Sequence, residues 1–165
     1  MKTILIGCLV LWAEAGRSQD LRAVRSLFLQ AGNSEEACRD LLAKARSFNE
    51  SNAVMMGYAG AAAMIMARHT INPFAKISWF REGRRSLDSA IGSDSWSAEL
   101  HYLRYCIQRH CPGFLGYNGC IAADRAFLFE FLQADGDNEL KKMIHEALSQ
   151  DPAVQPSLTV IKKSD

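Results

Sequence analysis

The chain has 165 residues, of which 48% are hydrophobic and 22% are charged, a composition typical of a folded protein and too apolar for an intrinsically disordered one. The formal charge is +1, so the chain lacks the net positive field that drives binding to nucleic acid. We therefore expect one folded domain and no nucleic-acid partner.

The amino terminus has the features of an export signal. Lys2 is followed by the apolar run Ile4–Ala13, which has the length of a signal-peptide core and about half the length of a membrane span. Gly16 and Ser18 favour cleavage before Gln19, although a cut before Gly16 stays open. Residues 1–18 are therefore predicted to be a signal peptide, and the mature protein is expected to be exported, to the periplasm.

Two alternatives to a simple exported chain are disfavoured. A lipoprotein acylated at Cys8 would have too few residues before the cysteine to form a normal apolar segment. The second apolar run, Ala53–Ala67, is shorter than a membrane span and rich in alanine and glycine, so it predicts a core helix. We expect no transmembrane anchor in the mature chain.

Helical patterns dominate the rest of the sequence, with no clean alternation of apolar and polar residues. Helix starts are indicated at Asn33 (three residues before Glu36), Asn52, Asn72 and Asp137, and helix ends by glycine and proline. An all-α fold follows, with helices predicted near residues 19–31, 34–48, 52–69, 72–91, 95–111, 118–132 and 137–148.

Each predicted helix carries an apolar stripe that we expect to face the core. In the 72–91 helix this stripe comprises Phe74, Ile77, Phe80, Leu87 and Ile91. In the 95–111 helix it comprises Trp96, Leu100, Leu103 and Ile107.

Short links between the helices indicate antiparallel hairpins. The starts at Asn52 and Ser95 are 43 residues apart, which exceeds the ~34-residue tetratricopeptide period and lies nearer to the ~40–47 residues of HEAT-type pairs. We expect residues 19–150 to form a degenerate, tetratricopeptide-like right-handed α-α superhelix, with a plain helical bundle as the alternative. Residues 151–165, which contain two prolines, are expected to be a polar tail.

Three stretches carry a resemblance to a known family: GYAGAAAMIMARH (57–69), NPFAKISWFREGRRSLDSAI (72–91) and ELHYLRYCIQRHCPGFLGYN (99–118). They resemble a family of uncharacterised exported proteins from Bacteroidetes whose members look tetratricopeptide-like. The likeness covers roughly residues 20–135, and the loop of residues 112–117 is its most specific part. The resemblance implies a fold and an export route, but no catalytic residue.

Four cysteines remain after removal of the signal peptide. A disulfide between Cys111 and Cys120 would join the ends of the intervening loop, while the alternative is that all four are small buried side chains. The intervals between these cysteines and His101 or His110 do not fit a zinc site, and no metal is expected.

Two segments are candidate binding sites. In the loop of residues 111–119, Phe114, Leu115 and Tyr117 could contact a ligand, or the first two could fold back onto the core. In the 72–91 helix, arginines beside aromatic residues could contact an acidic partner or an anionic surface glycan, or could form a solvated face. The arginines concerned are Arg81, Arg84 and Arg85.

Catalytic and cofactor-binding motifs are absent from the sequence, so we expect no cofactor and no catalytic residue. A non-enzymatic interaction or scaffold module in the cell envelope, with a protein or peptide as its partner, is the leading hypothesis, because stacked hairpins present grooves. The alternative is a small-ligand carrier or an enzyme with a pocket beside the 111–119 loop.

Overall fold

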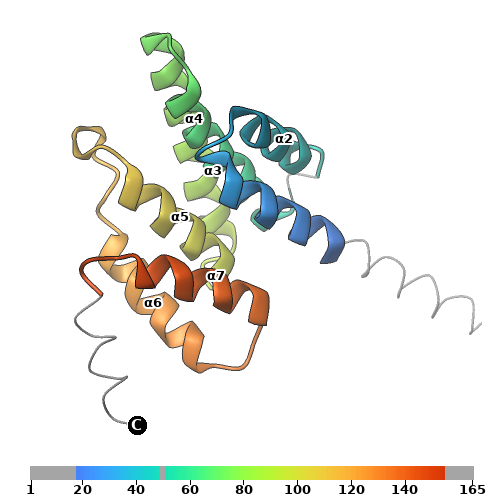
Figure 1. Ribbon diagram of the computed structural model, residues 1–165, viewed down its shortest axis with the longest axis vertical. Helices are drawn as coiled ribbons and strands as arrows, with labels where there is room; N and C mark the ends of the chain where they lie inside the picture. The colour runs from blue at the N-terminus through green and yellow to red at the C-terminus, as the bar shows by residue number, and fades with distance from the viewer. Residues whose placement is uncertain (1–17, 49–50, 155–165) are drawn as a thin grey trace, which may run out of the picture. The chain divides into compact units, whose positions relative to one another are not determined.

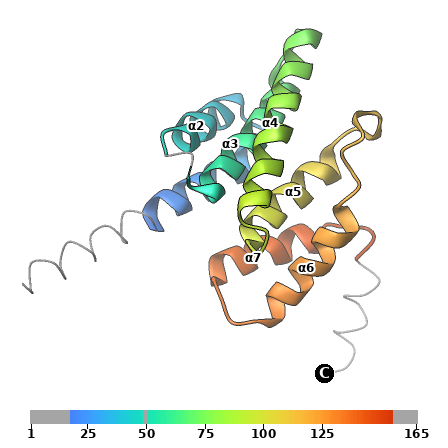
Figure 2. The same ribbon diagram turned by 180° about the vertical axis from the view of Figure 1, so that it is seen from behind.

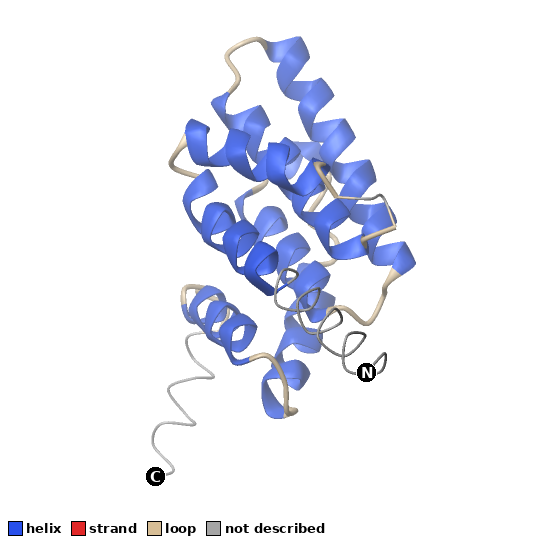
Figure 3. Cartoon of the chain, turned by 90° about the vertical axis from the view of Figure 1, so that its right-hand side faces the viewer, coloured by secondary structure: helices blue, strands red, loops and turns tan. Residues whose placement is uncertain are grey.

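The computed structural model describes residues 18–48 and 51–154, and within these ranges every regular element is helical (Figure 3). Seven α-helices and one short 3-10 helix are present there, which confirms the predicted all-α class. Residues 1–17 of the predicted signal peptide and residues 155–165 of the predicted tail lie outside the described residues, whereas Ser18 and Gln19, on either side of the favoured cleavage point, belong to the first described helix. None of the described helices combines the length and the apolar character that crossing a membrane requires.

The chain divides into two compact units, residues 1–88 and 89–165, where the sequence suggested a single domain. The first unit contains a helix over residues 18–31, α2 (Glu35–Arg46), α3 (Ala53–His69) and the first part of α4 (Pro73–Ser93). The second contains the end of α4, then α5 (Ala98–His110), the 3-10 helix η1 (Gly113–Leu115), α6 (Ile121–Gln133) and α7 (Asn138–Ser149).

Side-chain caps start the helices close to the predicted positions. The Asn52 side chain accepts a hydrogen bond from the backbone N–H of Met55 (3.1 Å), and Asn72 accepts one from Phe74 (2.9 Å). The α2 helix is capped by Ser34, one residue after the predicted Asn33. The positions of these capping residues were therefore predicted from the sequence to within one residue.

The first unit is built around small and apolar side chains of its first three helices. The rings of Phe28 and Tyr58 meet edge to face, with centroids 5.9 Å apart. The Cys38 thiol donates to the carbonyl oxygen of Ala62 at 3.3 Å, which places α2 directly against α3. The fully enclosed side chains of this core include Val24, Ala31, Cys38, Leu41, Tyr58, Ala61 and Ala62.

Two glycines set the closest approach within the first unit, between α3 and α4. A Cβ atom on Gly60 would lie 2.7 Å from the carbonyl oxygen of Gly83 and 2.7 Å from the backbone nitrogen of Leu87. The Ser86 hydroxyl also donates to the carbonyl oxygen of Met56 at 3.0 Å. The two helices therefore pack backbone against backbone, which only residues without a side chain allow.

The second unit pairs α5 with α6 and places α7 against both. Its fully enclosed apolar side chains are Ala90, Leu100, Leu103, Tyr105, Leu128 and Ile144. The packed structure also continues past the predicted boundary at residue 150, because Asp151 and Val154 are 6% and 2% exposed. The first residues of the expected polar tail are therefore part of this core.

Candidate functional site

The amino-terminal half of α4 and the residue before it carry several exposed apolar side chains. No residue from 68 to 82 is buried, and Ile71, Phe74 and Ile77 are 96%, 84% and 46% exposed. Within the first unit, these turns of α4 project beyond α2 (Figures 1 and 2). Apolar side chains gathered on an uncovered surface are typical of an interaction site.

The predicted apolar stripe of this helix was wrong for Phe74 and Ile77, and helix geometry explains why. An α-helix turns by about 100° per residue, so Phe74 lies about 180° from Gly83 and Ile77 about 120° from it. Gly83 marks the side of α4 that meets α3. Leu87, only about 40° from Gly83, is fully buried as predicted. The sequence stripe therefore combined side chains from two faces of the helix.

A shallow depression of about 420 Å³ lies along the outer face of α4. Five side chains at helical spacing line it, and we call them the α4 stripe: Phe74, Ile77, Ser78, Arg81 and Arg85. Two of the three arginines predicted as binding residues therefore lie beside exposed apolar side chains. The third, Arg84, pairs with Asp88 at 3.6 Å instead.

The two arginines of the α4 stripe form no ion pair with the described residues. Among residues 18–48 and 51–154, no carboxylate lies within 4.0 Å of the guanidinium group of Arg81 or Arg85. The recorded polar contact of Arg85 is a long hydrogen bond to the backbone carbonyl of Arg81, at 3.4 Å. Arg46, by contrast, forms an ion pair with Glu82. The stripe therefore offers two positive charges one helical turn apart.

A second cluster of charged side chains is centred on Asp124 in the first turn of α6. Its carboxylate has no exposed surface, and it accepts hydrogen bonds from Arg104 Nε (2.8 Å) and Nη2 (2.6 Å). His101 Nδ1 lies 2.7 Å from the same carboxylate. Burial alone would raise the pKa of Asp124, but the hydrogen bonds from Arg104 and His101 outweigh it and hold the pKa below its usual value.

This cluster was not predicted from the sequence, because Asp124 is 20 residues from Arg104 and 23 from His101 and the three residues form no motif. One signal was present: His101 and Arg104 are three residues apart, so they share a face of one helix. Finding their partner requires the register in which α5 and α6 pair, and a single sequence does not give that register.

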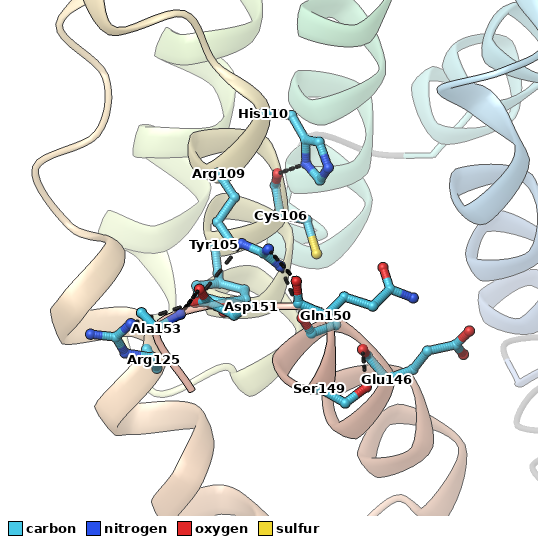
Figure 4. Close-up of polar contacts among 11 residues, drawn as sticks. Tyr105, Cys106, Arg109, His110, Arg125, Glu146, Ser149, Gln150, Asp151 and Ala153 are labelled. Carbon is cyan, nitrogen blue, oxygen red and sulfur yellow. Dashed lines mark hydrogen bonds and ion pairs between the residues drawn. The ribbon is translucent and has the colours of Figure 1, made fainter. Parts of the chain in front are cut away.

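A third cluster surrounds Asp151 just after α7 (Figure 4). The Tyr105 hydroxyl donates to the Asp151 carboxylate at 2.6 Å, while Arg125 Nη1 lies 3.5 Å and Arg109 Nε 3.9 Å from the same oxygen. Arg109 also donates to the carbonyl oxygens of Ala147 and Gln150 at 2.9 Å each. These bonds satisfy carbonyls at the end of α7 and tie α5, α6 and α7 together.

Both buried carboxylates are bonded to side chains of neighbouring helices. Asp124 and Asp151 accept hydrogen bonds from arginine, histidine or tyrosine donors, and both ring nitrogens of His101 contact oxygen atoms. Both clusters therefore act as clamps between helices.

The loop of residues 111–119 places its three predicted binding residues differently. Phe114 is 87% exposed in η1, Leu115 is half-buried, and Tyr117 is 4% exposed. Phe114 therefore does not fold back onto the core, whereas Tyr117 does. Gly116 next to them has a positive φ of 61°, a conformation that glycine adopts without strain.

The four described cysteines form no disulfide, so the Cys111–Cys120 bridge stays a prediction. Burial raises the pKa of Cys38 to about 11 and that of Cys106 to about 12. Neither thiol is therefore a reactive thiolate at neutral pH.

Trp96, expected on the inner stripe of α5, lies before that helix in the 94–97 loop and is 84% exposed. Its ring centroid is 6.4 Å from that of Phe127, which stacks on the His101 ring at 4.2 Å. The inward prediction for Trp96 was wrong, because α5 begins two residues later and its stripe starts with Leu100.

In comparisons with known proteins, no family model, no curated protein and no solved structure matches the chain.

Proposed function

We propose that the chain is an exported, non-enzymatic interaction module whose α4 stripe binds an acidic amphipathic helix of a partner protein in the cell envelope. The single observation that carries the proposal is the combination of exposed Phe74 and Ile77 with Arg81 and Arg85 along one depression. Export rests on the predicted signal peptide, and the family resemblance agrees with it.

The spacing of the stripe favours a helical partner. Its residues follow one another at intervals of one to four along α4, which gives a straight apolar and basic track. An amphipathic helix presents side chains at the same intervals and packs along such a track. An apolar side chain of the partner would lie beside Phe74 and Ile77, about two turns from a pair of acidic residues.

The positive charges of Arg81 and Arg85 favour a partner helix with acidic side chains. Arg81 and Arg85 are four residues apart, or about 6 Å along the helix axis, which matches carboxylates at i and i+4 on a facing helix. Arginine binds carboxylates through two parallel hydrogen bonds, so each pair adds geometric selectivity as well as charge.

The alternative site beside the 111–119 loop has less support. The depression on α4 takes no lining residue from that loop, and Tyr117 is packed into the protein. Phe114 alone offers a single exposed ring, without the polar groups that orient a small ligand.

A labelled helical peptide with leucines on one stripe and glutamates at i and i+4 tests the site directly by fluorescence anisotropy. We expect Arg81→Glu and Arg85→Glu each to raise the Kd about tenfold, because charge attraction becomes repulsion. Phe74→Ala should weaken binding without unfolding the chain, since that side chain is 84% exposed. Arg39→Glu on α2, whose side chain is 69% exposed, is the matched control and should leave the Kd unchanged.

Several outcomes would contradict the proposal. The peptide with glutamine in place of glutamate could bind equally well, or Arg39→Glu could weaken binding as much as Arg81→Glu. An anionic polysaccharide such as heparin could bind through Arg81 and Arg85 with no effect of Phe74→Ala, which would identify a glycan site. Sedimentation could show that the stripe joins two copies of the chain.

The native partner can be captured with a photo-crosslinking amino acid at Ser78, which lies in the stripe between the apolar and basic residues. Support requires that the crosslinked segment be an acidic amphipathic helix and that Arg81→Glu abolish the adduct. Amino-terminal sequencing of the mature protein tests export, and a product that retains Lys2 would refute it.

A further inference from the structure

Both ring nitrogens of His101 face oxygen atoms. Nδ1 lies 2.7 Å from a carboxylate oxygen of Asp124, and Nε2 lies 3.0 Å from the backbone carbonyl oxygen of Ser95. A carbonyl oxygen never donates a hydrogen bond, and an ionised carboxylate does not either. Both contacts are therefore hydrogen bonds only when the ring carries a proton on each nitrogen, as imidazolium.

The surroundings of the ring hold Asp124 in its ionised form. Arg104 binds the carboxylate with two nitrogens, at 2.8 and 2.6 Å, so a permanent positive charge always lies against it. The hydrogen bond to Asp124 in turn raises the pKa of His101, although burial opposes the shift. The charged groups facing the ring are Asp124 from α6 and Arg104 from α5 itself.

The loop of residues 94–97 between α4 and α5 begins with a backbone bond from Asp94 N to the carbonyl oxygen of Ala90 at 3.0 Å. Beyond Asp94, the bond from His101 to Ser95 is short, whereas the bond from Ser97 N to the carbonyl oxygen of Asp94 is long at 3.4 Å. Ser97 occupies the cap position of α5, but its side chain makes no capping hydrogen bond. The carbonyl group of Ser95, in the middle of the loop, is thus held by the Nε2 proton of His101.

We propose that His101 is a proton-operated latch: as an imidazolium it ties the 94–97 loop to α6, and on losing the Nε2 proton it releases Ser95 and frees Trp96. The neutral ring keeps its Nδ1 proton, because the bond to the Asp124 carboxylate is charge-assisted and the stronger of the two. The Nε2 lone pair then faces the carbonyl oxygen of Ser95 at 3.0 Å, and the two repel.

The direction of the switch follows from the raised pKa of His101 in the folded chain. The latch is closed below that pKa and opens as the pH rises through it. Trp96 moves with the loop, so its ring leaves its position 6.4 Å from Phe127, whereas the Asp124–Arg104 bonds stay intact.

An NMR titration of the full-length, ¹⁵N-labelled protein from acidic to alkaline pH tests the latch. At the acidic end we expect two ring N–H signals from His101. The indole N–H of Trp96 and the amides of Ser95 and Trp96 should then shift with the same midpoint as the His101 ring. The hydrogen-exchange protection factors of the loop should fall about tenfold, in line with the loss of one hydrogen bond to a charged group.

Matched variants separate the latch from other causes of pH dependence. His101→Gln should abolish the sigmoidal shift of the Trp96 indole signal, while His145→Gln, at an exposed histidine of α7, should leave it as in the wild type. If the His101→Gln variant does not fold, the wild-type titration tests the latch by itself, through the midpoints of the His101 ring and the Trp96 signals.

Three results would refute the latch. His101 could show a single ring N–H signal throughout the titration. The Trp96 signals could titrate with a midpoint different from that of His101. The amides of Leu128 and Ile144 could lose protection together with the loop, which would mean that the whole unit opens.

Discussion

Asp124 is an enclosed carboxylate whose two oxygens are fully paired within the chain. Its side chain has no exposed surface, yet Arg104 and His101 supply three hydrogen bonds to its two oxygens. Enclosing a charge is unfavourable unless it is paired and hydrogen-bonded, and both conditions hold here. No buried side-chain nitrogen or oxygen among the described residues lacks a partner. The charged groups of the second unit therefore belong to its packing.

The substitution Asp124→Asn tests this role. It preserves the shape of the side chain but removes the charge, so the guanidinium of Arg104 is left half-buried without its counter-ion. We expect the free energy of unfolding to fall by about 3 kcal/mol, as for other broken buried pairs. Urea titration followed by circular dichroism measures the change. Asp88→Asn, which removes a pair with 43–45% exposed side chains on α4, should change stability by less than about 0.5 kcal/mol.

At the scale of elements, α4 is the helix whose sequence was hardest to interpret. Its start at Asn72 and Pro73 was predicted, because a cap and a proline at the first helical position act locally. The buried face of α4 was not predicted, because apolar residues occur around most of the helix. Only the contact with α3 determines which of these residues are buried. Of the two glycines that make this contact, Gly60 lies in the alanine- and glycine-rich run of residues 53–67, which allows a neighbouring helix to approach closely, whereas no sequence pattern distinguishes Gly83.

The substitution Gly83→Ala tests whether the α3–α4 contact holds the first unit together. A Cβ atom at this position would lie 2.7 Å from the Cγ and 2.8 Å from the backbone nitrogen of Met64. A clash with a backbone atom is not relieved by rotating a side chain. We expect destabilisation by about 1–3 kcal/mol, measured by thermal unfolding. Gly92→Ala in the same helix meets nothing within 4 Å, and should instead stabilise by up to about 1 kcal/mol. A Gly83→Ala variant with unchanged thermal stability would contradict the close contact between α3 and α4.

At the scale of the whole molecule, the two units differ in how deeply the carboxylates of their ion pairs are buried. In the first unit, the ion pairs Lys44–Asp20 and Arg46–Glu82 have side chains that are 33–47% exposed. Those of the second unit enclose Asp124 and Asp151, with side chains only 0% and 8% exposed. Exposed ion pairs contribute little to stability. Protonation of the carboxylates at low pH should therefore destabilise mainly the second unit.

We predict that the second unit loses stability first as the pH falls below about 4, near the pKa of an unfolded aspartate. Burial alone would raise the pKa of Asp151, but the bonds from Tyr105 and the neighbouring arginines lower it, as Arg104 and His101 do for Asp124. A lowered pKa contributes stability above the unfolded value, and this contribution disappears as the pH falls towards the folded value. Amide exchange checks the order: Ile144 should lose protection at a higher pH than Leu41. The reverse order would refute it.

The sequence predicted the all-α class, the number of helices and most of their caps, because these depend on a few neighbouring residues. It did not predict the division at residue 88, the packing of Val154 or the pairing of His101 with Asp124. Each of these depends on contacts between residues far apart in the chain. Of the proposed site, Arg81 and Arg85 were predicted from charge, whereas the exposure of Phe74 and Ile77 required the helix to be placed against α3.

The glycine contact between α3 and α4 also fixes the direction in which the α4 stripe points. Arg81 and Gly83 are separated by one residue, and every inserted residue turns the preceding part of a helix by about 100° relative to the rest. A one-residue insertion at Glu82 would leave all five stripe side chains in the sequence. It would nevertheless rotate the four that precede it, Phe74, Ile77, Ser78 and Arg81, from the outer face of α4 towards α3 and out of line with Arg85. This segment can therefore accept changes of residue type more readily than changes of length.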